Sequence, residues 1–155
     1  MKHDEARGEW RDGEARYLMI RNDSLMGMFA RLEEPARSDA LRALAESIAA
    51  HGGRSAARYR AEDAEAFLSR VTAMAAQLGW GHWVLSREDG GLRLVVENSP
   101  FAGGFGAAAA PVCAPISGML QAVASLALGA PAIAEEIRCA AAGATECAFR
   151  ARLRP

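Results

Sequence analysis

The chain has 155 residues, a length that suits one domain with a single sizeable core. Its 18 lysines and arginines nearly balance its 19 aspartates and glutamates, so the formal net charge is −1 and the chain lacks the basic excess typical of nucleic-acid-binding proteins. The first residues lack the apolar core of a signal peptide, so we expect a cytoplasmic protein.

The N-terminal segment is charged and interrupted by glycines. Residues 1–14 contain Gly8 and Gly13, which predicts a mobile charged arm in front of a ligand-binding domain over residues 15–155. A short strand is expected to open that domain over residues 15–21.

Three helices are expected next, because apolar residues recur at helical spacing. The first covers residues 25–32 and is ended by Pro35. The second begins at Ser38 and ends at Gly52-Gly53. The third covers residues 62–78, with acidic residues in its first turn, where the helix dipole favours them.

The pattern then changes from helical spacing to that of strands. Residues 83–87 and 92–97 predict a β-hairpin with a turn at Asp89-Gly90-Gly91. The preceding Trp80-Gly81-His82-Trp83 brings together two indoles and one imidazole. One interpretation is an aromatic pocket wall with His82 as its polar group. The other is that Trp83 packs in the core while His82 faces water.

Residues 101–134 contain no charged side chain. A transmembrane helix needs about 20 predominantly apolar residues, but this stretch is rich in alanine and glycine and is interrupted by Pro111 and Pro115. We therefore expect a glycine-rich loop, then a buried helix over residues 115–128, and no membrane span.

Two final strands are expected over residues 132–141 and 145–153, so the chain predicts an α+β domain with an antiparallel sheet packed by helices. A turn at Gly143 would place residues 139 and 147 opposite each other, with Cβ atoms about 4.5–5.5 Å apart. Three thiolates and one carboxylate make a closed tetrahedral shell of the kind that structural zinc prefers. The candidate ligands include every cysteine of the chain: Cys113, Glu136, Cys139 and Cys147.

Two other interpretations of the cysteines remain open. They could be buried free thiols, or Cys139 and Cys147 could form a disulfide, although an odd cysteine count is a poor disulfide framework. A metal site also requires an irregular strand. Glu136 and Cys139 are three residues apart and would face opposite ways in regular β geometry, so a bulge is needed to bring both to one ion.

The segments around these ligands resemble the 4-vinyl reductase domain family over residues 80–153. The resemblance rests on Pro111-Val112-Cys113, Ser117-Gly118, Glu136-Ile137-Arg138-Cys139, Gly143 and Cys147, with Glu97-Asn98-Ser99-Pro100-Phe101 upstream. It implies a fold like that of TRAPP subunits, often dimeric, with an antiparallel sheet and helices around an apolar cavity. In the sensory members a Cys, Glu, Cys, Cys set holds zinc, which implies the same role for Cys113, Glu136, Cys139 and Cys147.

The resemblance also suggests where a ligand would bind. In the aromatic sensors a ligand-contacting tryptophan precedes the Glu-Asn-Ser-like segment, and Val96 stands at that place here. This departure argues against a phenol held by that indole. Phe101 and Phe105 could close a pocket or simply hold the loop in place, and Gln121 could contact a polar group or lie at the wetter edge of the helix. The candidate ligand-binding residues are Trp80, His82, Trp83, Val96, Phe101, Phe105 and Gln121.

Three functions remain open. The first is a zinc-stapled binding domain for a small hydrophobic or aromatic molecule, acting as a stand-alone sensor or carrier and forming a homodimer. The second is a 4-vinyl reductase-like enzyme or accessory protein of (bacterio)chlorophyll or tetrapyrrole synthesis, although no nicotinamide or flavin motif is visible. The third is a structural dimerisation module. No catalytic set of residues stands out, which favours the first function.

Overall fold

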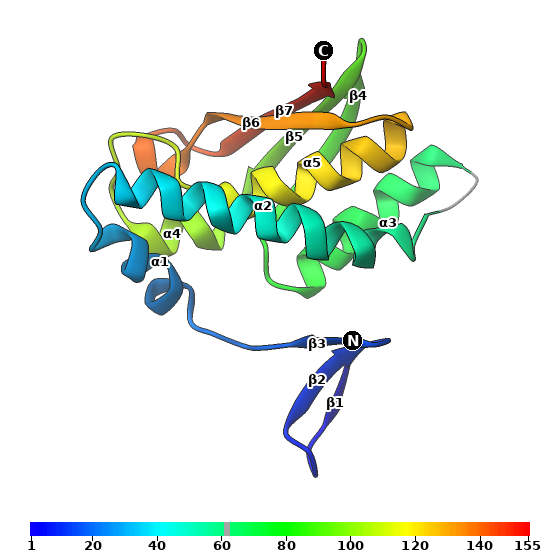
Figure 1. Ribbon diagram of the computed structural model, residues 1–155, viewed down its shortest axis with the longest axis horizontal. Coiled ribbons are helices and arrows are strands. Elements are labelled where there is room, and N and C mark those ends of the chain that lie inside the picture. Colours follow the sequence, from blue (N-terminus) through cyan, green and yellow to red (C-terminus); the bar gives the residue numbers. More distant parts are fainter. Residues whose placement is uncertain (61–62) are drawn as a thin grey trace.

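A four-stranded antiparallel sheet with helices against one face forms the body of the protein (Figure 1). The computed structural model describes residues 1–60 and 63–155. In chain order its elements are β1 (Lys2–Asp4), β2 (Glu9–Asp12), β3 (Ala15–Tyr17), α1 (Asn22–Ala30), α2 (Ala36–Ala57), α3 (Ala64–Gln77), β4 (His82–Glu88), β5 (Gly91–Glu97), α4 (Pro100–Phe105), α5 (Ala114–Leu128), β6 (Ala132–Arg138), the 3-10 helix η1 (Ala140–Ala142) and β7 (Cys147–Leu153). The predicted single α+β domain is confirmed.

The sheet has the strand order β4-β5-β7-β6, and each neighbouring pair is antiparallel. β4 and β5 form the predicted hairpin, in which Glu88 pairs with Gly91 and the turn consists of Asp89 and Gly90. Gly90 has a positive φ of 69°, as two-residue hairpin turns require. Alternate side chains of the strands point to the helices and are buried there: Trp83, Leu92, Leu94, Val96, Phe149 and Ala151.

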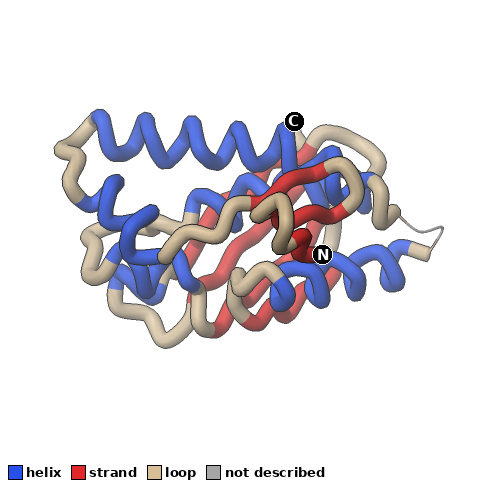
Figure 2. Tube along the Cα trace, turned by 90° about the horizontal axis from the view of Figure 1, so that it is seen from below, coloured by secondary structure: helices blue, strands red, loops and turns tan. Residues whose placement is uncertain are grey.

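The helices build two layers on that face of the sheet (Figures 1 and 2). α5 packs against β6 and β7, α2 packs on α5, and α3 packs against β4 and α5. α5 therefore lies between the sheet and another helix, which explains why residues 101–134 need no charged side chain. Ile116, Leu120 and Val123 of α5 are completely buried, as the sequence predicted. Within the described ranges, no helix is both long and apolar enough to cross a membrane.

α2 continues beyond the point where the sequence predicted its end. Gly52-Gly53 was expected to terminate the helix, but it runs on to Ala57. The reason is the close approach of α5: a Cβ at Gly52 would lie 2.6 Å from Cε of Met119, and one at Gly53 would lie 3.1 Å from Cβ of Ala122. These glycines serve helix packing and do not end the helix.

The helix starts also differ from the prediction. α2 begins at Ala36, before the predicted Ser38, whose hydroxyl donates a hydrogen bond to the Glu34 carboxylate. α3 begins after Asp63, whose carboxylate accepts hydrogen bonds from the next free backbone N–H groups. Residue 62, the predicted start of this helix, lies outside the described residues.

The segment expected to be a glycine-rich loop contains the short helix α4. The Ser99 hydroxyl accepts a hydrogen bond from the N–H of Ala102 and so caps this helix. Gly104 allows α4 to contact the start of α1, because a Cβ there would lie 2.5 Å from the carbonyl oxygen of Asn22. Glycine in this stretch again permits backbone contact, and the loop prediction is wrong for residues 100–105.

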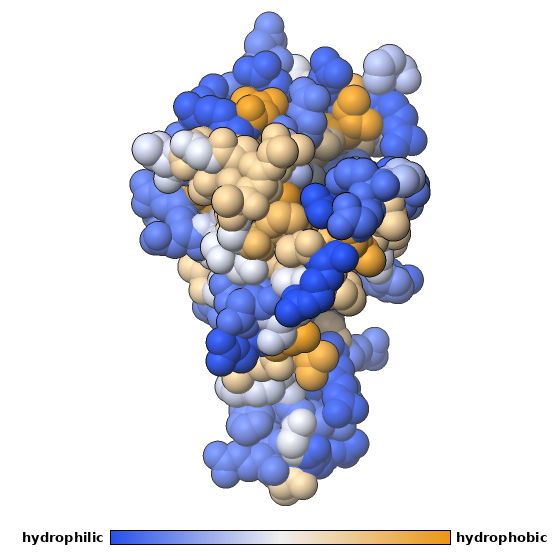
Figure 3. Space-filling view, turned by 90° about the vertical axis from the view of Figure 1, so that its left-hand side faces the viewer, coloured by the Kyte–Doolittle hydropathy of each residue, from blue (hydrophilic) through white to orange (hydrophobic). Residues whose placement is uncertain are grey.

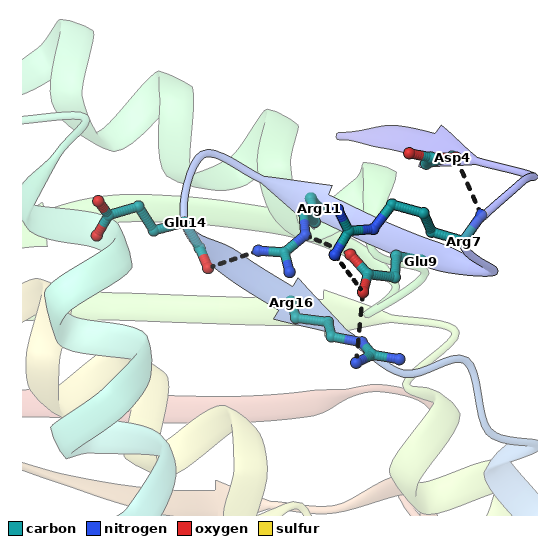
Figure 4. A network of polar contacts seen from close by, with 6 residues as sticks. All are labelled: Asp4, Arg7, Glu9, Arg11, Glu14 and Arg16. Atoms are coloured by element: carbon teal, nitrogen blue, oxygen red, sulfur yellow. Dashed lines mark hydrogen bonds and ion pairs between the residues drawn. The ribbon is translucent and has the colours of Figure 1, made fainter.

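Residues 1–17 contain three short antiparallel strands, where the sequence predicted a mobile arm followed by one strand. Figure 4 shows three arginines converging on Glu9, which is buried on this sheet. The Arg11 Nε atom lies 2.6 Å from Glu9, and Arg7 and Arg16 each approach the other carboxylate oxygen to 3.6 Å. The mobility of residues 1–14 stays a prediction.

The N-terminal sheet lies on the side of α2 and α3 that faces away from the four-stranded sheet (Figures 1 and 2). Figure 3 shows it as a narrow, mostly hydrophilic projection below the body. Asp12 connects it to the end of α2, because its carboxylate accepts a hydrogen bond from the Tyr59 hydroxyl and lies 3.7 Å from the Arg58 guanidinium. This hydrogen bond raises the pKa of Tyr59 to about 12.

Candidate metal centre and apolar cavity

The structure brings the four candidate metal ligands together from three elements. Cys113 occupies the position immediately before α5, Glu136 lies on β6, Cys139 follows that strand, and Cys147 begins β7. One potential ligand atom from each residue lies within 4.8 Å of the others. The three cysteines are buried and carry free thiols, so the structure contains no Cys139–Cys147 disulfide.

The sulfur spacing fits a tetrahedral metal site. Sγ of Cys113 lies 3.6 Å from Sγ of Cys147 and 3.9 Å from Sγ of Cys139. Two thiolates on one tetrahedral zinc, each at a bond length of about 2.3 Å, would be about 3.8 Å apart. The two sulfur–sulfur distances bracket this value, so the thiols already have the separation that one such ion requires.

Glu136 reaches the cluster because β6 is irregular. The pairing of β6 with β7 shifts between Glu136 and Arg138, which is the irregularity that the sequence analysis required. One carboxylate oxygen of Glu136 accepts a hydrogen bond of 2.8 Å from the N–H of Cys113. The other oxygen, Oε1, is buried and has no hydrogen-bond partner. A buried carboxylate oxygen without a donor is costly, and a cation would satisfy it.

The loop from β6 to β7 is not the regular hairpin that the sequence predicted. The ladder ends where Arg138 pairs with Ala148, and η1 follows before the turn at Gly143, which has φ +96°. The N–H of Ala140, in η1, donates to Sγ of Cys147. η1 therefore supplies a backbone donor to a ligand sulfur, as N–H groups commonly do for thiolates in metal sites.

The cluster is unfavourable for negative charge unless a cation is present. Burial raises the pKa of the Glu136 carboxyl to about 8, with a further contribution from Cys139. The pKa of the Cys113 thiol is raised by its contacts with Cys139 and Cys147 and by burial. The pKa of Cys139 is lowered by its contacts with Cys113 and Cys147. A divalent ion would supply the positive charge that the ionised ligands lack.

Ser99 joins the cluster, and the sequence analysis did not assign it there. Its hydroxyl lies 3.3 Å from Sγ of Cys113 and is buried. Because the same oxygen caps α4, it links this helix to the thiol. The Ser-Pro pair that begins α4 was a visible signal for a cap, but only the fold reveals the sulfur contact.

An apolar cavity lies on the far side of α5 from the metal ligands, next to α2 and α3. Its volume is about 50 Å³, and it is lined by Tyr17, Gly52, Ser55, Ala56, Tyr59, Val71, Met74, Ala75, Leu78, Trp80, Trp83 and Met119. A dry cavity of about 150 Å³ holds a benzene molecule. An aromatic ring would therefore enter only if side chains move, and the unbranched Met74 and Met119 are suited to do so.

Two of the predicted ligand-binding residues line this cavity and one supports it. Trp80 and Trp83 are part of its wall, and the Trp83 indole N–H donates to the carbonyl of Trp80. Phe101 packs edge-on against Trp80, with ring centroids 5.1 Å apart. These aromatic contacts hold the Trp80 indole in a defined orientation.

The other predicted ligand-binding residues lie elsewhere. The His82 side chain is 65% exposed and lies 3.3 Å from the Glu97 carboxylate, so the prediction of His82 as the polar group of an aromatic pocket is wrong. It faces outward because side chains alternate along β4 and Trp83 faces inward. Val96 is completely buried on β5, Phe105 is half-buried under the Arg37 guanidinium, and Gln121 lines a separate shallow groove.

The sequence analysis missed the half of the cavity wall that α2 and the N-terminal strand provide. Tyr17, Tyr59 and Met119 are the large residues concerned. Tyr59 follows α2 by two residues, so its place could not be predicted once the helix was expected to end at Gly52-Gly53. Tyr17 lies on a strand whose position relative to the body depends on tertiary contacts alone.

An antiparallel sheet covered by helices on one face, with a cysteine cluster joining the N-terminus of α5 to the last strand pair, defines a domain of the kind shared by 4-vinyl reductase family members and TRAPP subunits. Residues 92–153 match the model of the 4-vinyl reductase domain, so the chain contains this domain over that range and the resemblance is confirmed. No curated protein matches the sequence.

Solved structures with the same fold include three of different kinds. The phenol-responsive sensory domain of the transcription activator PoxR, solved with phenol, is 17% identical with a TM-score of 0.82, over 98% of this chain and 84% of that one. A vinyl-4-reductase family protein from Methanocaldococcus jannaschii is 12% identical with a TM-score of 0.59, over 86% and 91%. Trafficking protein particle complex subunit 3 from Naegleria fowleri, covalently bound to palmitic acid, is 13% identical with a TM-score of 0.60, over 86% and 95%.

Proposed function

We propose that this protein is a zinc-stapled binding domain for a small hydrophobic or aromatic molecule, acting as a sensor or carrier. The observation that carries the proposal is the apolar cavity walled by Trp80, Trp83 and two methionines. Ligand sites are concave and mainly apolar, with few polar groups. The similarity in fold to the PoxR domain, which responds to phenol, adds support.

The proposed role of zinc is structural. Three sulfurs and one carboxylate complete a four-coordinate shell, so no ligand position is left for water or substrate. The ion would be held by Cys113, Glu136, Cys139 and Cys147, and would fix the start of α5 to β6 and β7. The cavity, on the other side of α5, would bind the small molecule independently.

Native mass spectrometry of the protein purified from its own host tests both parts of the proposal. We expect one zinc ion per chain and a co-purified apolar molecule of low mass. Removal of that molecule with an organic extraction should leave the zinc in place. A metal-free protein that also fails to bind any apolar probe would contradict the proposal. The same spectra would report the proposed homodimer through the mass of the assembly.

The Met119→Ala variant should bind apolar rings more tightly, because truncation enlarges a cavity that is smaller than a benzene-sized space. Each methylene-sized volume that a ligand fills contributes about 0.8 kcal/mol, which is about fourfold in affinity. The affinity for toluene or naphthalene can be measured from the fluorescence of Trp80 and Trp83. Met28→Ala is the matched control, because Met28 is 52% exposed on α1 and lies outside the cavity. Unchanged or weaker binding by Met119→Ala would place the ligand elsewhere.

A further inference from the structure

A wide groove adjoins the apolar cavity and shares part of its wall. The groove has a volume of about 630 Å³, and the two spaces share Tyr17, Gly52, Ser55, Leu78, Trp80 and Met119. A molecule whose apolar end fills the cavity would therefore extend past Trp80 and Met119 into this groove. The remaining groove residues should be complementary to the other end of the ligand.

The rest of the groove is rich in arginine. Arg16, Arg54 and Arg58 line it, together with His51, and Glu14 is the one carboxylate among its lining residues. Figure 4 shows the Glu14 side chain pointing away from the arginines that surround Glu9. The charge of the groove is thus positive, whereas the charge of the whole chain is −1.

The three arginines differ in how far their charge is already neutralised. Arg16 lies 3.6 Å from Glu9, and Arg58 lies 3.7 Å from Asp12. Arg54, in the last turn of α2, has no carboxylate within ion-pair distance among residues 1–60 and 63–155, and its guanidinium contacts the Nδ1 atom of His51. Arg54 is therefore the groove cation whose charge is left for a ligand.

We infer that the ligand is a small carboxylate with one apolar ring, whose ring enters the cavity beside Trp80 and whose carboxylate lies in the groove at Arg54. This inference rests on the proposed function, because it assigns a chemical class to the ligand of the same cavity. A guanidinium binds a carboxylate through two parallel hydrogen bonds, which gives orientation as well as affinity. A neutral ring compound would fill the cavity but leave the arginine-lined groove without a partner.

The test compares 3-phenylpropionate with its neutral amide, 3-phenylpropanamide, by calorimetry and tryptophan fluorescence. Toluene serves as the probe of the cavity alone. We expect the carboxylate to bind about tenfold more tightly than the amide, as is typical of hydrogen bonds between charged groups. Added salt should weaken binding of the carboxylate and leave the amide unchanged. The Arg54→Gln variant should lose the preference, and the control Arg70→Gln, an exposed arginine on α3, should keep it.

The outcomes separate this inference from the proposed function. Equal affinities for acid and amide, with toluene still bound, would overturn the inference and leave the binding function standing. A preference that survives in Arg54→Gln would overturn the assignment of Arg54. Failure of all three probes to bind the wild-type protein would overturn the inference and would also contradict the proposed cavity function.

Discussion

Removal of the metal with a chelator is expected to lower the melting temperature by more than about 10 °C. Structural zinc contributes about 10–16 kcal/mol to the folding of small finger peptides. This domain has a large apolar core, so only part of that stabilisation should be needed here. A loss of about 4 kcal/mol would shift the melting temperature of a protein of this size by about 8–16 °C.

The Cys113→Ser variant should reproduce the loss and should no longer respond to the chelator, because the ligand at the start of α5 is gone. Circular dichroism melts with and without chelator provide the measurement. Ser117→Ala, one turn further along α5, is the control and should melt like the wild-type protein in both conditions. A wild-type melting curve that ignores the chelator would indicate three buried free thiols instead of a metal centre.

The Gly118→Ala variant should be the most destabilising substitution that adds a single methyl group. Gly118 is on α5 where it crosses α2, and a Cβ there would lie 2.2 Å from the carbonyl oxygen of Ala45 and 2.9 Å from its Cα. Overpacking of this kind typically costs about 1–3 kcal/mol, and contact with rigid backbone favours the upper end. Urea denaturation should show a lower midpoint with an unchanged slope.

Gly103→Ala is the matched control for this experiment. Gly103 is also helical, on α4, and a Cβ there would meet nothing within 4 Å. This substitution should be neutral or slightly stabilising, since alanine favours the helix. Similar midpoints for the two variants would show that α2 and α5 can separate without cost and would contradict the close crossing.

The metal cluster was predictable from sequence because its evidence is local and chemical. The chain has three cysteines, and their spacing around Glu136 defines both the ligand set and the need for an irregular strand. The structure brings the four residues together and places the strand irregularity where it was required. The hairpin and the buried α5 were predictable for a similar reason, because hydrophobic periodicity within one segment specifies them.

The cavity was only half predictable because tertiary contacts create the other half. Gly52 and Gly53 look like a helix end in the sequence, and only the neighbouring α5 shows that they are packing positions. This difference removed Tyr59 and Ser55 from consideration. His82 shows the opposite limit. Its neighbours are aromatic, but the alternation along β4 directs its imidazole away from them.

The position of Cys113 also determines which wall of the cavity can respond to a ligand. Met119 lies six residues after Cys113, which is about 9 Å along α5, so a metal that fixes the first residue also restrains this part of the helix. The opposite wall is formed by α2, Tyr59 and the N-terminal strand, which are connected through Asp12. Expansion of the cavity around a ligand would therefore displace the N-terminal sheet more than the zinc-bound end, so the output of a sensor built on this chain should be sought at its N-terminus.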